Sequence, residues 1–237
     1  MSTGRMKRAI LGLAWIACAG ALSAQSDMRG HWSGSLTTPA GALGMEVDLD
    51  KTASGWIGSI AIPMQGATGV PLEQISFADG KGSFHLKGGA GDPSFSGTLS
   101  ADGKTLDGNF SQAGQSLPLK FTRSGEAKVE VPKASPAITA EFVGSWEGTI
   151  PVGQGLRVVL TIANGKNGAE AQMVSVDQGN AQVPVASITQ SGTKLSLKIN
   201  AIGGGYEADI NPAGTELNGT LTQMGNAMPL QLKKSVK

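Results

Sequence analysis

The chain has 237 residues, with 19 basic and 18 acidic side chains, 35 glycines, one cysteine and two histidines. The balanced charge excludes the strongly basic surface of an electrostatic nucleic-acid binder, and the composition excludes a polytopic membrane protein or a disordered chain. One cysteine allows neither an intramolecular disulfide nor a cysteine-based zinc cluster, and two histidines leave little for metal or triad chemistry. We therefore expect no metal and no cofactor.

Residues 1–24 have the pattern of a secretory signal peptide. Arg5, Lys7 and Arg8 precede an uncharged apolar run, and small residues follow at the cleavage position. The apolar run is shorter than the roughly 20 residues of a spanning helix. The sequence therefore predicts cleavage, a secreted or periplasmic location and no transmembrane segment in the mature chain. The alternative is a lipoprotein signal in which Cys18 is lipidated.

The rest of the chain contains one module twice. Four motifs recur in the same order and at nearly constant spacing: Gly30-His31-Trp32-Ser33-Gly34 as Gly144-Ser145-Trp146-Glu147-Gly148, Gln65-Gly66 as Gln178-Gly179, Leu106-Asp107-Gly108 as Leu217-Asn218-Gly219, and Gln112-Ala113-Gly114 as Gln223-Met224-Gly225. Each copy has the size of a small domain. We predict a first module over residues 29–124, a linker over 125–140 and a second module over 141–235.

Both copies have the hydrophobic period of short antiparallel strands. Apolar residues alternate with polar ones, as at Leu43, Met45, Val47 and Leu49 and again at Leu156, Val158, Leu160 and Ile162. This pattern indicates sheets with one buried face. Turn signals such as Asp79-Gly80 and Asn164-Gly165 separate the runs. The prediction is an all-β chain of two tandem, small, antiparallel up-and-down β-barrels, lipocalin-like, with about eight strands each. The alternative is a flattened sandwich.

The repeated motifs supply the candidate ligand-binding or structural residues. We expect the two tryptophans to be buried at one end of each barrel, with Gly34 and Gly148 leaving room for a neighbour against the indole. We expect the Gln side chains to tie loop and hairpin backbones. Contact with a ligand is the alternative for both groups. The full set of candidates is Trp32, Trp146, Gln65, Asp177, Gln178, Tyr206, Gln112 and Gln223.

No catalytic constellation is visible in the sequence. No serine lies in a nucleophile elbow, and there is no HExxH zinc motif. Gly203-Gly204-Gly205 precedes a predicted strand and not a helix, so it does not indicate a phosphate-binding loop. We expect no catalytic residues and no enzymatic activity.

The order of motifs resembles that of a small non-catalytic β module that precedes α/β-hydrolase domains, of the esterase or serine aminopeptidase type, in secreted bacterial proteins. The second copy carries it best, with Trp146, Asp177-Gln178-Gly179, Tyr206 and Pro229-Leu230. The hydrolase domain is absent from this sequence, so the resemblance implies an accessory or binding role. The Gly-x-Trp motif also resembles the opening of lipocalin and avidin-like barrels, an analogy at the level of fold that implies a small ligand.

These observations predict a secreted, non-enzymatic tandem β-barrel protein that has an accessory or binding role in the cell envelope. Its partner would be a protein, a surface or a small apolar ligand, and we expect a monomer that binds no nucleic acid. The first alternative is a lipocalin-like carrier of a small apolar ligand. A further alternative is a hydrolase-associated protein.

Overall fold

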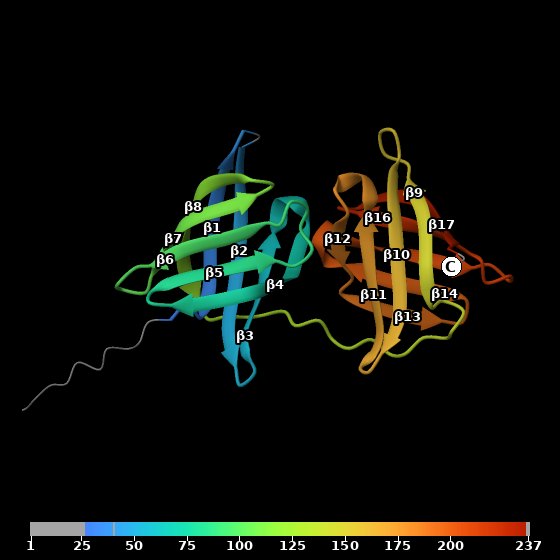
Figure 1. Ribbon diagram of the computed structural model, residues 1–237, viewed down its shortest axis with the longest axis horizontal. Helices are drawn as coiled ribbons and strands as arrows, with labels where there is room; N and C mark the ends of the chain where they lie inside the picture. Colours follow the sequence, from blue (N-terminus) through green and yellow to red (C-terminus); the bar gives the residue numbers. More distant parts are fainter. Residues whose placement is uncertain (1–26, 40, 236–237) are drawn as a thin grey trace, which may run out of the picture.

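The computed structural model describes residues 27–39 and 41–235. The predicted signal peptide and Cys18 lie outside the described residues. Within them, no helix combines the length and the apolar character needed to cross a membrane. Figure 1 shows two β units joined by an extended segment.

The first unit is a closed barrel, in which every strand pairs antiparallel with its neighbours in sequence and the last strand pairs with the first. Its strands are β1 (Gly30–Thr38), β2 (Gly41–Thr52), β3 (Gly55–Ile62), β4 (Ala67–Ala78), β5 (Lys81–Leu86), β6 (Ser94–Leu99), β7 (Thr105–Gln112) and β8 (Gln115–Gly125). The alternation predicted for β2 is present, because Met45, Val47 and Leu49 are buried while the residues between them are more exposed.

The second unit is a curled antiparallel sheet of nine strands. Its strands are β9 (Gly144–Ile150), β10 (Leu156–Gly165), β11 (Gly168–Ser175), β12 (Ala181–Pro184), β13 (Ser187–Ser191), β14 (Lys194–Ile199), β15 (Gly204–Ile210), β16 (Glu216–Gln223) and β17 (Asn226–Lys234). The predicted all-β, antiparallel barrel fold is confirmed. The second sheet differs from a closed barrel in one respect, since β12 and β13 are its two edges and do not pair with each other.

This opening arises where one strand of the repeat is broken. In the first unit, β4 stays continuous: its start pairs with β3, and the rest pairs with β5. The ladder between β4 and β5 contains a bulge, where Gln74 has a φ of 51°. In the second unit, β12 pairs with β11 and β13 pairs with β14. The strand ends at Pro184, although the corresponding Pro71 lies inside the continuous β4.

A residue between the two units bridges the open seam. The Ser135 carbonyl accepts a hydrogen bond from the Ala169 N–H on β11 (3.1 Å), and the Ser135 hydroxyl accepts one from the Ile188 N–H on β13 (2.9 Å). Ser135 is 9% exposed. The second sheet is therefore completed by a residue of the predicted linker.

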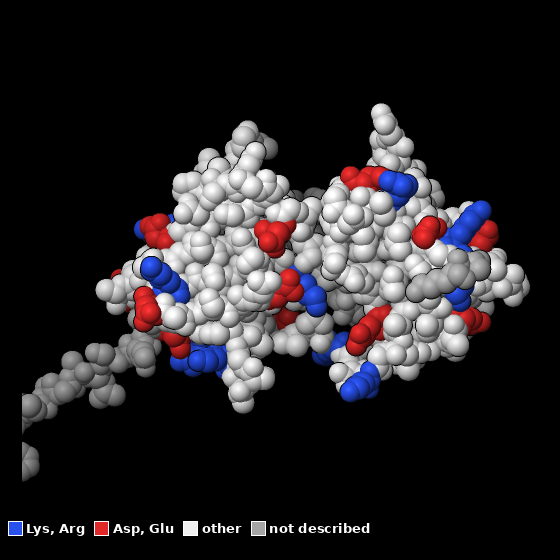
Figure 2. Space-filling model, viewed as in Figure 1, with Lys and Arg blue, Asp and Glu red and all other residues white. Residues whose placement is uncertain are grey.

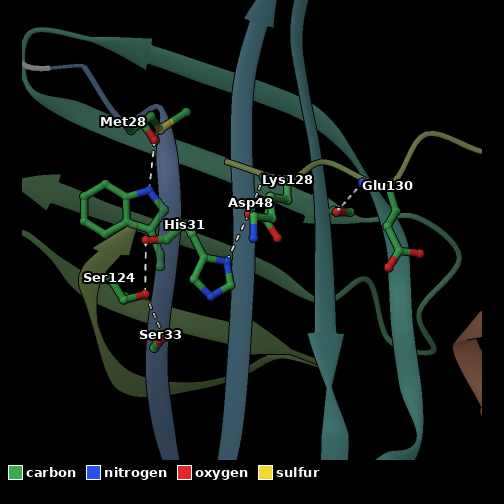
Figure 3. A network of polar contacts seen from close by, with 9 residues as sticks. Met28, His31, Ser33, Asp48, Ser124, Lys128 and Glu130 are labelled. Atoms are coloured by element: carbon green, nitrogen blue, oxygen red, sulfur yellow. Dashed lines mark hydrogen bonds and ion pairs between the residues drawn. The ribbon is translucent and has the colours of Figure 1, made fainter. Parts of the chain in front are cut away.

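The predicted linker also contacts the first unit, as Figure 3 shows. The Lys128 N–H donates to Asp48 Oδ1 (2.8 Å), the oxygen that also lies 3.0 Å from His31 Nδ1. The Glu130 N–H donates to the hydroxyl of Ser59, which is buried (3.2 Å). The segment is thus held against both units by specific hydrogen bonds.

Candidate ligand-binding site

A cavity of about 720 Å³, open to solvent on one side, lies at one end of the first barrel, among the ends of its strands. Its deeper wall consists of apolar side chains from several strands, among them Leu36, Met45, Ile60, Val70, Leu86 and Phe110. These residues are all at most 8% exposed, so they belong to the core of the unit as well as to the cavity. Volumes of about 300–1,000 Å³ are typical of sites that hold small molecules.

Polar side chains lie at the rim of this cavity. Gln65, Gln112 and Gln115 line it, and Lys87 is the one charged residue among its described lining residues. Met64 also lines it although this side chain is 69% exposed, so part of the rim is an exposed apolar surface. An apolar interior with a few polar groups at its edge fits a molecule that has an apolar body.

Two of the sequence-predicted candidates, Gln65 and Gln112, lie at this rim. Gln65 ends η1 (Pro63–Gln65), a short helix between β3 and β4 that stops at Gly66, whose φ is 65°. Gln112 ends β7, and its Nε2 donates to the Ala90 carbonyl (2.8 Å) in the loop between β5 and β6. The cavity therefore brings together side chains that are distant in sequence.

The two tryptophans do not line this cavity. Trp32 and Trp146 are fully buried, and each indole N–H donates to the carbonyl four residues earlier, that of Met28 (3.0 Å) or Phe142 (2.9 Å). A cation from the last strand of each unit covers each ring. These geometries give both side chains a structural role.

The glycine two residues after each tryptophan makes room for the last strand. A Cβ at Gly34 would lie 2.7 Å from the Phe121 ring and 2.8 Å from the Lys120 carbonyl, and one at Gly148 would lie 2.7 Å from Leu232. The sequence predicted that each glycine leaves room for a neighbour against the indole. In the structure the neighbour is a side chain of β8 or β17, and it lies against the glycine itself.

Three candidates of the second unit lie outside the barrel cavity, two of them next to each other in η2. Asp177, in η2 (Val176–Gln178), accepts hydrogen bonds at Oδ1 from Nε and Nη2 of Arg157 and at Oδ2 from the Arg157 backbone N–H. These bonds hold the pKa of the carboxyl below its usual range. Gln178 accepts a hydrogen bond from the Ser175 hydroxyl (2.9 Å). Gln223 is exposed at the end of β16. None of these three side chains lines the barrel cavity.

Tyr206 is fully buried inside the second unit. Its hydroxyl donates to the Leu230 carbonyl (2.9 Å) and lies 3.2 Å from the Leu217 carbonyl. Burial raises the pKa of this hydroxyl well above its ordinary value. The side chain therefore ties two strands together from within, which is a structural role.

A second hollow, of about 580 Å³, lies between the units. The linker contributes Lys133 and Ser135 to it, the second unit contributes residues of β10 to β13, and the first unit contributes Lys87 and Gly88. Its walls are more polar than those of the barrel cavity, with Glu170 and Gln172 among them. Lys87 thus lies where the two hollows meet.

Charged groups form no obvious reaction centre in the described structure. Within the described residues, no group of three or more His, Cys, Asp or Glu side chains could hold a metal ion. On the face shown in Figure 2, cationic and anionic side chains are interspersed and neither sign gathers into a patch. Among the features described, the barrel cavity is the one from which a function can be argued.

Sequence reasoning did not identify the cavity, Lys87 or Ala201. Ala201 belongs to η3 (Asn200–Ile202) of the second unit, yet it lines the cavity of the first. No sequence pattern pointed to these residues, because a cavity depends on how side chains from several strands fill a barrel.

Comparisons with known proteins give distant structural likenesses. A protein of unknown function from the DUF3598 family of Nostoc punctiforme is 13% identical, with a TM-score of 0.23, over 87% of this chain and 96% of that one. A protein described as an AttH from Nitrosomonas europaea is 13% identical, with a TM-score of 0.22, over 98% and 100%. Holo-PhuS, a heme-binding protein from Pseudomonas aeruginosa, is 11% identical, with a TM-score of 0.17, over 92% and 79%.

At these scores the likenesses carry no functional argument. No protein-family model matches the chain. No curated protein matches it either. The predicted resemblance to a hydrolase-associated module therefore stays a prediction, and the function has to be argued from the barrel and its cavity.

Proposed function

We propose that this protein is a non-catalytic binding protein that holds a small apolar molecule inside its first barrel. The cavity of about 720 Å³ carries this proposal. A fully filled barrel would have favoured a role confined to the outer surfaces. The open, apolar cavity at the end of the first barrel instead favours the carrier that was the alternative from the sequence.

The lining also restricts the chemistry of the ligand. Apolar side chains form the deep part of the cavity, three glutamines lie at the rim, and Lys87 is the one charged group among the described lining residues. A cationic ligand would face a like charge, whereas an anionic or hydrogen-bond-accepting group would face a favourable one. The ligand we propose has an apolar body and one polar or anionic end, as in a single-chain fatty acid.

The proposed setting is the one that the first 24 residues predict, outside the cytoplasm. An apolar molecule crossing an aqueous compartment needs a protein to bury its surface, because each buried CH₂ group contributes about 0.8 kcal/mol. An accessory role beside a hydrolase is compatible with this proposal, since a carrier could deliver or remove an apolar substrate or product.

The first experiment measures ligand binding with a filled cavity as the comparison. Ala67 lines the cavity and is 3% exposed, so Ala67→Phe would place a ring inside it. Ala181 has the same place in the repeat, because Ala67 pairs with Ile62 and Ala181 pairs with Ser175 at equivalent ladder positions. Ala181→Phe is therefore the matched control.

Titration with a fluorescent fatty acid should give saturable binding to the parent protein and to Ala181→Phe. Binding to Ala67→Phe should be weaker by about tenfold or more, since overpacking a site costs about 1–3 kcal/mol. Lys87→Gln should weaken binding of the fatty acid more than binding of the corresponding fatty alcohol. Equal affinity of both alanine variants, or no binding to the parent protein, would contradict the proposal.

A further inference from the structure

The short helix η3 of the second unit lies between the cores of both units. Ala201 packs against the apolar core of the first unit, whereas the next residue, Ile202, packs against the core of the second. Ala201 also lines the cavity of the first barrel. One residue of the second unit is therefore part of the wall of a site that otherwise belongs to the first.

A close contact between two backbones holds η3 in this place. Gly203, with a φ of +59°, follows η3, and Gly66 follows η1 at the rim of the cavity. A Cβ at Gly203 would lie 2.6 Å from the Gly66 carbonyl oxygen, closer than real Cβ atoms approach. The two units can meet here because neither residue has a side chain.

The opposite contact uses the equivalent loop of the first unit. Gly88 follows β5 and lies against the carbonyl of Gln182 and the ring of Pro184, both on β12. β5 and β14 are equivalent, since Phe84 pairs with Phe95 as Leu197 pairs with Tyr206. Each unit thus presents the same loop of the repeat to the other unit, and the two contacts are reciprocal.

We propose that the ligand site is shared between the two units, with η3 of the second unit forming an outer wall of the first barrel's cavity. This inference rests on the proposed function. Ala201 then limits the size of the ligand, and the contact between Gly66 and Gly203 sets how far the cavity is open. The duplication produces one composite site, in which one copy holds the ligand and the other helps to enclose it.

The test measures access to the cavity without any ligand. The parent protein for this test is the full chain with Cys18→Ser and Ala67→Cys, which places a single thiol in the cavity wall. Gly203→Ala is added to push η3 away from Gly66. Gly192→Ala is the matched control, because Gly192 also has a φ of +59° but an added Cβ there would meet nothing within 4 Å.

A charged thiol reagent should label the thiol introduced at position 67 about tenfold faster in Gly203→Ala than in the parent, because the added Cβ destabilises the closed contact. A tenfold change in the open population corresponds to about 1.4 kcal/mol. Gly192→Ala should label at the parent rate, which separates the contact from the strain of a positive φ. Equal labelling rates in the two glycine variants would overturn the shared wall.

A second variant acts in the opposite direction. Ala201→Leu adds apolar volume at the mouth, so it should slow the labelling of the introduced thiol and weaken binding of longer fatty acids more than shorter ones. Ala213→Leu, at an exposed turn, should do neither. If Ala201→Leu changes neither labelling nor chain-length preference, the inference is wrong. The two proposals can fail separately. If the unmodified protein binds no fatty acid but the labelling rates differ as expected, the proposed function is wrong and the shared wall still stands.

Discussion

The guanidinium of Arg123 lies over the ring of Trp32, 4.4 Å from its centre. Its Nε donates to the Gly103 carbonyl (2.8 Å) and its Nη2 to the Asp27 carbonyl (2.6 Å), while Nη1 donates to the Arg29 carbonyl. One side chain therefore covers the indole and ties the segment before β1 to the loop between β6 and β7. In the second unit Lys234 takes this place, 5.0 Å from the Trp146 ring.

Arg123→Ala should lower the free energy of unfolding by about 1–3 kcal/mol, because it removes a cation–π contact and several charge-assisted hydrogen bonds. Arg123→Lys should retain part of this stability, as it imitates the second unit. Lys234→Ala should cost less than Arg123→Ala. Urea unfolding followed by tryptophan fluorescence checks the order, and a larger loss for Lys234→Ala would contradict it.

Gly34→Ala should destabilise the first barrel by about 1–3 kcal/mol, since the added Cβ would meet the Phe121 ring and the Lys120 carbonyl. Gly44, on the neighbouring strand, is the control because a Cβ there meets nothing within 4 Å. Gly44→Ala should be neutral or stabilise by up to about 1 kcal/mol. Thermal unfolding of both variants measures the difference, and equal effects would rule out the steric reason.

Tyr206 should make stability depend on alkaline pH. Its folded pKa is raised above the unfolded value of about 10, so its contribution is fully present below that pH and is lost as the pH rises further. Tyr206 is the one tyrosine of the chain, so tyrosinate absorbance reports on it alone. We expect ionisation to coincide with unfolding. Tyr206→Phe should remove this part of the pH dependence, and a normal titration in the folded protein would contradict the buried hydroxyl.

Ser135→Ala should open the seam of the second sheet. It leaves the Ile188 N–H without its hydrogen-bond acceptor in a buried position, which costs about 1–3 kcal/mol. Hydrogen exchange of the Ile188 amide should become faster in the variant. Ser191→Ala, at an exposed position of β13, should leave that exchange rate unchanged. An unaltered Ile188 amide in Ser135→Ala would show that the seam does not depend on the hydroxyl.

The sequence predicted those features that depend on local periodicity. Alternating apolar residues such as Met45, Val47 and Leu49 place one face of a strand in a core, and the repeated tryptophan motifs mark the first strand of each unit. The all-β antiparallel fold and the closed first barrel follow from such patterns. Pairing between strands that are neighbours in sequence needs no long-range information.

The open seam and the cavity could not be predicted in this way. Both copies contain a Val-Pro step, yet β4 continues past Pro71 while β12 ends at Pro184. In the second copy Ser135, from outside the sheet, bonds to both sides of the seam. The role of Ala201 depends on a contact between Gly66 and Gly203, which are far apart in the sequence and carry no side chain that could signal it.

The position of Ser135 has a consequence for how the protein can be divided. A fragment cut at the compositional boundary, beginning at residue 141, would contain every strand of the second sheet but would expose the backbone groups of β11 and β13 that Ser135 covers. Exposed strand edges recruit other chains. Such a fragment would tend to self-associate, so the boundary that respects the fold lies before Ser135.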